Sequence, residues 1–278
     1  AERRGELDYW RSVLAADDPT LGRRRLDPTV DTADRLTRTT VVVPDEVSEI
    51  LLAPRGAESA TTAEVLVAAL SVAVAAWRAE RGETAAAPLL TLEGHGREEA
   101  VVPGSDLART VGWFTTMYPA RVDLSGLDPA AVVDGRAAGG DDVVARTRTS
   151  FADVPDHGIG YGMLRYLDDE SGATLREFAE PQIVFNYIGR VAETGVPEEL
   201  RGSAWLPDFD TPDLTDVARN RMPAQAELDI QSMAETDEAG SRIKAFLSFP
   251  PDVLGEDEVD ALTQKWLAAL AVLAGRRT

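Results

Sequence analysis

The chain has 278 residues, of which 44% are apolar, so it is long enough for one large or two small domains and can bury a substantial core. Its 48 acidic and 28 basic residues give a net charge of −20, which disfavours nucleic acid and anionic membranes as partners. It has no cysteine and only two histidines, which excludes a disulfide framework, a thiolate nucleophile and a His-rich metal site.

The start of the chain and its apolar runs indicate where in the cell the protein is expected. The longest apolar run, residues 65–77, is too short to span a membrane. The charged start Ala1-Glu2-Arg3-Arg4 has no apolar stretch behind it, so no signal peptide is expected. A start without Met fits either processing or a piece of a longer polypeptide. A chain without cysteine fits the cytoplasm, where thiols stay reduced, and we expect a cytoplasmic protein.

The first expected elements are a short amphipathic helix over residues 7–14, a polar connector over 17–34 and a β-branched strand over 38–43. A helix is expected over 45–52, with Asp45 as its N-cap. The apolar residues that this helix is expected to bury are Val47, Ile50 and Leu51.

The clearest helix spans residues 62–81. Thr61 and Glu64 form a capping-box pattern, in which each side chain bonds the other residue's free backbone N–H. Gly82 follows as a C-terminal stop. The helix is apolar almost all round, so we expect it to be deeply packed.

The second half mixes strands and helices. Residues 227–233 and 242–249 are expected to pair as a hairpin, and residues 195–221 form a long excursion rich in Pro and Asp. This mixture predicts an α/β fold, a mixed β-sheet covered by helices, rather than a purely parallel sheet. The remaining strands are expected over 88–93, 118–124 and 182–188, and the remaining helices over 141–150 and 256–274.

A glycine-flanked acidic turn follows an apolar strand at Glu93. Gly94 and Gly96 allow the backbone to bend sharply or to approach a ligand. A carboxylate partly buried at a strand end has a raised pKa, so Glu93 can act as a general acid or base; the alternative is a structural turn. Glu98 and Glu99 are expected to be solvated acids.

Further polar and aromatic candidates flank this turn. His95 is a candidate general base, although a lone histidine is more often structural. Arg97 can pair with a substrate carboxylate or phosphate, or with a buried structural acid. Residues 109–119 include Trp113 and Phe114; such a segment can wall a binding channel or simply fill a core.

Residues 155–162 contain alternating glycines beside Tyr161. They lack the spacing and the preceding strand of a dinucleotide fingerprint and are not a P-loop, so nucleotide binding is rejected here. Asn186 and Tyr187 end an apolar strand, and adjacent residues of an ideal strand point to opposite faces. Only one of the two is expected to face a given cleft, unless the strand ends or bulges there.

Four segments, in this order, carry a family resemblance: residues 93–98 (EGHGRE), 109–119 (RTVGWFTTMYP), 155–162 (PDHGIGYG) and 185–190 (FNYIGR). Together they resemble the signature motifs of epimerization domains of nonribosomal peptide synthetases, in the condensation-domain superfamily. Residues 62–70 also resemble the helix motif that precedes them, with Glu64 where Asp is usual. The resemblance covers essentially the whole chain.

The resemblance implies one lobe of a two-lobed fold like that of chloramphenicol acetyltransferase. The family's N-terminal lobe carries a His-His-x-x-x-Asp-Gly motif, and this sequence has no adjacent histidines. We therefore expect only the C-terminal lobe, with a lobe-junction helix and connector over 1–35 and the lobe itself over 36–278. The chain alone is expected to be inactive, because the catalytic histidines belong to the missing N-terminal lobe.

The implied reaction is inversion of the α-carbon of an aminoacyl or peptidyl thioester held on the phosphopantetheine arm of a carrier protein, with no cofactor bound directly by this chain. The implied catalytic residues are Glu93, Asn186 and Tyr187. The implied partners are the carrier protein, the missing lobe and neighbouring synthetase domains. The residues expected to bind substrate are His95, Arg97, Trp113, Phe114 and Tyr161.

Two alternatives stay open, because a fold does not fix a function. One is a non-catalytic, condensation-like module that binds a carrier protein or recruits a partner enzyme. The other is a condensation-type acyltransferase.

Overall fold

The computed structural model describes residues 2–54, 56, 59–83, 88–101, 104–136, 140–192, 221–237 and 240–275. This part of the chain forms one mixed sheet of six strands, in the spatial order β1-β6-β5-β4-β2-β3. The central pairs β2–β4 and β4–β5 are parallel, and the outer pairs are antiparallel. The mixed α/β sheet is therefore confirmed. The strands are β1 (Thr37–Val42), β2 (Leu89–Gly94), β3 (Thr116–Arg121), β4 (Ile183–Ala192), β5 (Leu228–Asp237) and β6 (Gly240–Phe249).

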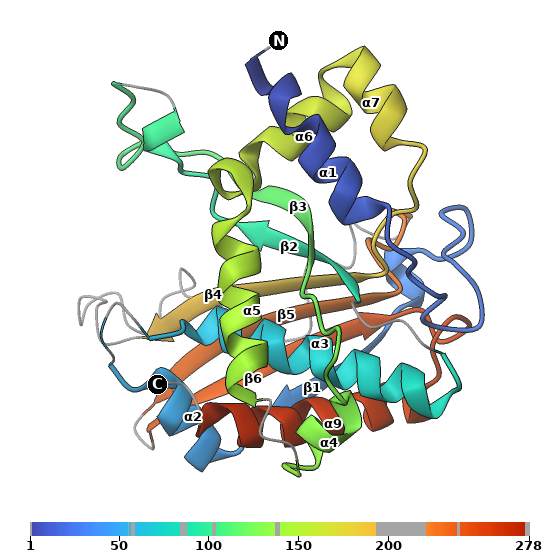
Figure 1. Cartoon of the computed structure of the whole chain (residues 1–278), viewed down its shortest axis with the longest axis vertical. Helices are drawn as coiled ribbons and strands as arrows, with labels where there is room; N and C mark the ends of the chain where they lie inside the picture. Colours follow the sequence, from blue (N-terminus) through green and yellow to red (C-terminus); the bar gives the residue numbers. More distant parts are fainter. Residues whose placement is uncertain are drawn as a thin grey trace.

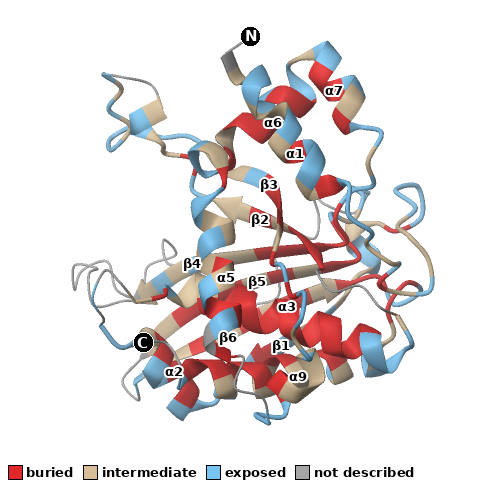
Figure 2. Ribbon diagram, in the orientation of Figure 1, coloured by how far each residue is buried: buried red, intermediate tan, exposed pale blue. Residues whose placement is uncertain are grey.

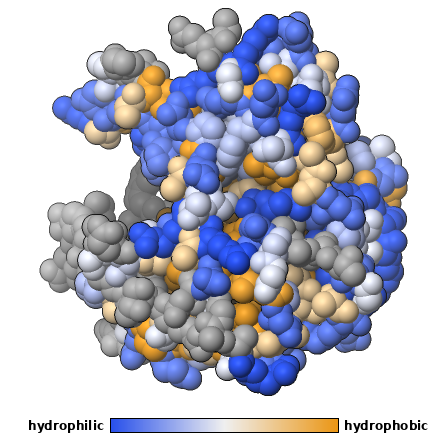
Figure 3. Space-filling view, in the orientation of Figure 1, coloured by the Kyte–Doolittle hydropathy of each residue, from blue (hydrophilic) through white to orange (hydrophobic). Residues whose placement is uncertain are grey.

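Two long helices, α3 (Thr62–Glu80) and α9 (Glu256–Ala274), lie over one face of this sheet (Figure 1). The others are shorter, and α4, α6 and α7 were not predicted. Hydrophilic residues predominate on the molecular face shown in Figure 3, with hydrophobic residues in small groups among them. The shorter helices are α1 (Leu7–Leu14), α2 (Asp45–Leu52), α4 (Pro129–Val133), α5 (Gly140–Ala152), α6 (Ile159–Tyr166) and α7 (Asp169–Leu175).

Helix α3 is the centre of the core. Its capping box is present: Thr61 Oγ1 accepts from the backbone N–H of Glu64, whose carboxylate accepts from the Thr61 N–H. Gly82 follows with φ +79°, as a stop residue requires. The helix is long and apolar enough to cross a membrane, contrary to our sequence estimate, but 78% of its apolar window is buried (Figure 2). Its apolarity is that of a core helix.

Helix α9 packs into the core through Trp266, which is 1% exposed. Its indole Nε1 donates to the backbone oxygen of Leu66 on α3 at 3.1 Å. Its ring meets Phe185 of β4 edge-on, with centroids 6.3 Å apart. One side chain thus joins both long helices to the middle of the sheet.

The first helix, α1, packs against β3 and α6. Trp10 of α1 is fully buried, and its ring lies 5.2 Å from that of Tyr161 on α6 and 6.3 Å from that of Tyr118 on β3. The division predicted between residues 35 and 36 stays a prediction.

Helix α2 begins at the expected residue, but Asp45 does not cap it and Ile50 is 39% exposed. Ser48 is buried instead: its hydroxyl donates to the Val43 oxygen and accepts from the Ile243 N–H, both at 3.1 Å. These bonds turn the Ser48 side of the helix toward β6 and leave Ile50 outside.

The predicted hairpin is confirmed, since β5 and β6 pair antiparallel from Asp229–Ser248 to Asp237–Gly240. The strands reach further toward the turn than the sequence indicated. The predicted excursion over residues 195–221 lies outside the described residues, apart from Arg221.

Candidate functional site

Glu93 occupies the second-last position of β2. Leu92, before it, is buried and belongs to the core that α3 and α9 cover. Because side chains alternate along a strand, Glu93 points to the opposite face of the sheet. It is half-buried there.

Three polar side chains line up beside each other on that face. The pairing of Leu92 with Phe185 places Glu93 next to Asn186, and Asn186 pairs with Gln231. Asn186 Nδ2 donates to Glu93 Oε2 at 3.1 Å and to Gln231 Oε1 at 2.9 Å. The parallel strands β2, β4 and β5 therefore build one polar row from residues far apart in sequence.

This surrounding alters the acidity of the Glu93 carboxyl. Burial raises the pKa of Glu93, and the negative charge of Asp229 raises it further, while the amides of Gln231 and Gln225 lower it. Burial is the largest of these effects, so the pKa lies above its usual value. A carboxylate with a raised pKa is a stronger base than an ordinary one, and is therefore better suited to take up a proton.

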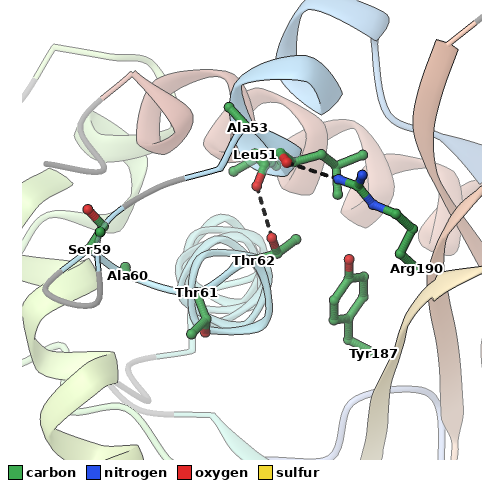
Figure 4. A pocket seen from close by; sticks show the side chains of 10 residues that line it. Leu51, Ala53, Ser59, Ala60, Thr61, Thr62, Tyr187 and Arg190 are labelled. Carbon is green, nitrogen blue, oxygen red and sulfur yellow. Dashed lines mark hydrogen bonds between the residues drawn. The ribbon is translucent and has the colours of Figure 1, made fainter. Parts of the chain in front are cut away.

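Tyr187 lies elsewhere. It lines a hollow of about 350 Å³ between β4, the end of α2 and the start of α3, as Figure 4 shows. Thr62 Oγ1 donates to the Leu51 oxygen there, and Arg190 donates to the Leu52 oxygen at 3.0 Å. The strand bulges only after Tyr187, where Gly189 has φ +100°. Asn186 and Tyr187 thus face opposite sides of the sheet, as strand alternation predicts.

The turn after Glu93 is held by its own side chains. His95 Nδ1 accepts from the Arg97 N–H at 3.0 Å, while its side chain is 71% exposed. Arg97 donates to the backbone oxygen of Leu107 at 2.6 Å and lies 4.5 Å above the Phe114 ring. Arg97 and Phe114 thus bind the turn to the segment that precedes β3.

Glu98 is not the solvated acid that the sequence indicated. Its side chain is only 16% exposed, because it lies between the Nε2 atoms of His95, at 3.6 Å, and His157, at 3.9 Å. Asp156 and His157 both have positive φ, a conformation that sequence reasoning did not find. Glu99, by contrast, is exposed as expected.

The other two substrate-binding candidates differ in exposure. Trp113 is 91% exposed, on the segment before β3. Tyr161 is 6% exposed and packs against Trp10. The structure therefore brings together Glu93 and Asn186, and separately His95, Arg97 and Phe114. It does not bring Tyr187, Trp113 or Tyr161 to the Glu93–Asn186 pair.

Comparison with known proteins decides the family, since the profile of the family described as "Condensation domain" matches residues 1–245. The chain belongs to the condensation domain family. Curated relatives include a component of the linear gramicidin synthase of Brevibacillus parabrevis, 32% identical over 76% of this chain and 3% of that protein. Another is chondramide synthase cmdD of Chondromyces crocatus, 35% identical over 69% of this chain and 4% of that protein. The chain spans only a small part of these synthases.

Solved structures share the fold. The epimerization domain from the third module of tyrocidine synthetase B aligns with a TM-score of 0.69 at 21% identity, over 98% of this chain and 55% of that one. The X-domain from teicoplanin biosynthesis aligns with a TM-score of 0.61 at 14% identity, over all of this chain and 56% of that one. The expected fold is therefore confirmed, and the chain spans about half the length of these solved domains.

Sequence reasoning missed Gln231 of the polar row, and Asp229 beside it, in this condensation-family chain. Asp229 and Gln231 stood out only as the polar positions of an alternating strand. Nothing in the sequence says that β5 lies beside β4, so neither residue could be placed next to Glu93. The parallel pairing of β4 with β5 is the information that the sequence lacked.

The acidic turn depends on Gly96, whose φ is +64° and whose added Cβ would lie 1.7 Å from the Phe114 oxygen. We expect Gly96→Ala to destabilise the fold by more than the roughly 1–2 kcal/mol that left-handed backbone costs a non-glycine residue, because backbone must also move. Urea unfolding measures the difference. Gly104→Ala is the matched control. The φ of Gly104 is +83° and nothing lies within 4 Å of an added Cβ, so this variant has only the cost of the left-handed backbone. Equal losses in both variants would contradict the close contact.

Proposed function

We propose that this chain is the C-terminal lobe of an epimerization domain, which inverts the α-carbon of an aminoacyl or peptidyl thioester on a carrier protein. One observation carries the proposal. The carboxyl of Glu93, in the EGHGRE segment, is half-buried at the end of β2, has a raised pKa and accepts a hydrogen bond from Asn186. Membership of the condensation domain family supports it.

The reaction needs a base on one face of the substrate and an acid on the other. Glu93, as the carboxylate, takes the α-proton; the C–H bond breaks and its electron pair moves into the thioester carbonyl as an enolate. A second group returns a proton to the opposite face, so atoms balance and the configuration inverts. Asn186 holds the Glu93 carboxylate in place through its 3.1 Å hydrogen bond. Because Tyr187 faces the other side of β4, we assign it no proton transfer.

The partners follow from this proposal. The substrate arrives on the phosphopantetheine arm of a carrier protein, beside neighbouring domains of a synthetase; the relatives are named as synthases. We propose that the second proton carrier is a histidine of the family's N-terminal lobe. The two histidines of this chain both lie against Glu98, within the turn and the loop before α6.

Deuterium exchange at the α-carbon of a carrier-bound aminoacyl thioester tests the function. We expect exchange with inversion from the complete two-lobed domain. From the 278-residue chain alone we expect no inversion, because the acid for the opposite face is absent and a proton taken by Glu93 can return only to the same face. Inversion by the chain alone would contradict the proposed division of labour. Carrier binding without exchange by the complete domain would indicate a binding module, and acyl transfer would indicate a condensation enzyme.

A further inference from the structure

Asn186 lies between two acceptors, and this decides how its amide must be turned. Its Nδ2 carries two hydrogens, and the two short contacts, to Glu93 Oε2 and Gln231 Oε1, use both. If the amide were flipped, its oxygen would face the Glu93 carboxylate and the Gln231 oxygen, and both contacts would become repulsive. The Asn186–Glu93 hydrogen bond therefore requires that Gln231 present its oxygen.

Gln231 is held in that orientation by Asp229. The Gln231 Nε2 donates to Asp229 Oδ1 at 2.8 Å. An ionised carboxylate only accepts hydrogen bonds, so Asp229 selects the nitrogen end of the Gln231 amide and leaves the oxygen end for Asn186. Asp229 and Gln231 are two positions apart on β5, so they share the face of the sheet that Glu93 occupies.

The side chains of the polar row come from strands rather than from loops. Asn186 and Gln231 are directly paired across β4 and β5, and Glu93 is next to them on β2. Asp229 is the charged group that acts on the Glu93 carboxyl among the described residues. The uncharged groups facing Glu93 from the neighbouring elements are Met117 of β3, Asn186 of β4, Gln231 of β5 and Gln225 before β5.

We propose that Asp229 and Gln231 are positioning residues of the Glu93 site, which fix the amide of Asn186 so that it donates to the Glu93 carboxylate. Their effect on turnover rests on the proposed function, whereas their effect on the Glu93 carboxyl does not. Asp229 also acts on Glu93 through its charge. The two residues affect the acidity of Glu93 in opposite directions, because the Asp229 charge raises its pKa and the Gln231 amide lowers it.

Two variants test these opposite effects on the pKa of Glu93. In Asp229→Asn the side-chain oxygen can still accept from Gln231, so the variant removes mainly the charge, and we expect the pKa of Glu93 to fall. In Gln231→Leu the volume is kept and the amide that holds Asn186 is lost. The Asn186 bond to the Glu93 carboxylate should then weaken, so we expect that pKa to rise. Titration of the 278-residue chain, with its glutamates ¹³C-labelled at the carboxyl, measures both shifts by NMR, and Glu93→Gln identifies the Glu93 signal.

The same variants in the complete domain give a second readout. We expect Gln231→Leu to lower kcat about tenfold, with KM little changed, as loss of one hydrogen bond that orients a charged group implies. Glu93 reacts as the carboxylate, so activity falls below its pKa. The acidic limb of the pH–rate profile should therefore move to lower pH in Asp229→Asn and to higher pH in Gln231→Leu.

Thr40→Val is the matched control, because Thr40 shares this face of the sheet on the edge strand β1 but takes no part in the row. It should leave the titration and kcat unchanged. Shifts of the Glu93 pKa in the same direction, or no shift, would overturn the proposal. If the titrations move as expected while Glu93→Gln retains full turnover, the positioning role stands and the proposed function fails.

Discussion

Replacing Glu93 by Gln in the complete domain is expected to cut epimerization at least roughly a hundredfold, the low end for loss of a general acid–base group. Glutamine keeps the shape of the side chain, and its oxygen can still accept from Asn186, but it cannot take the α-proton. Folding and carrier binding should therefore be nearly unchanged. The exchange assay on a carrier-bound thioester measures the loss, and circular dichroism and urea unfolding check the fold.

The control is Glu99→Gln, six residues along the same segment. Glu99 is exposed, and its carboxylate accepts from the Leu107 N–H at 2.6 Å, a bond that glutamine can also accept. We expect turnover close to that of the parent domain. Near-normal turnover of Glu93→Gln, or its loss only through unfolding, would identify Glu93 as a structural turn residue.

Trp266→Ala is expected to destabilise the chain by about 3–5 kcal/mol, the cost of removing a large aromatic side chain from a packed core. The variant leaves a cavity between α9, α3 and β4 and deprives the Leu66 oxygen of its indole donor. Since whole domains are stable by only about 5–15 kcal/mol, the loss is a large share of the total. Urea unfolding, followed by the remaining tryptophans, measures it.

Trp113→Ala removes the same side chain from a 91% exposed position. Its free energy of unfolding should stay within about 0.5 kcal/mol of the parent chain, as for surface changes in general. If Trp113→Ala lowered the free energy of unfolding as much as Trp266→Ala, Trp113 would have to be packed in solution, and this expectation would be wrong.

Much of the fold could be predicted because the local signals are strong. The final helix has the predicted bounds, and α3 begins at the predicted capping box, because apolar periodicity and cap chemistry are local properties. Helices α6 and α7 were missed, since they are eight and seven residues long and contain glycines that weaken a helical pattern. Strand order was out of reach, because it depends on packing between distant segments.

In the candidate site too, local patterns could be predicted and contacts between distant segments could not. Strand alternation was enough to separate Asn186 from Tyr187, and the bulge at Gly189 comes too late to change it. Glu98 was misjudged because His157, which covers it, comes from a loop about sixty residues further along. Gln231 and Asp229 were missed because their proximity to Glu93 is created only when β4 pairs with β5.

The pairing of β1 with β6 has a consequence for how the chain is made. Thr37 pairs with Phe249, so β1 waits for the much later strand β6 before its backbone hydrogen bonds can form. Contacts of such long sequence separation slow folding, because much chain entropy is lost before they stabilise anything. Until β6 is synthesised, β1 carries unpaired N–H and C=O groups, and so does the β5 edge that β6 later covers. Nascent chains are thus exposed to strand-mediated association until β6 has been synthesised.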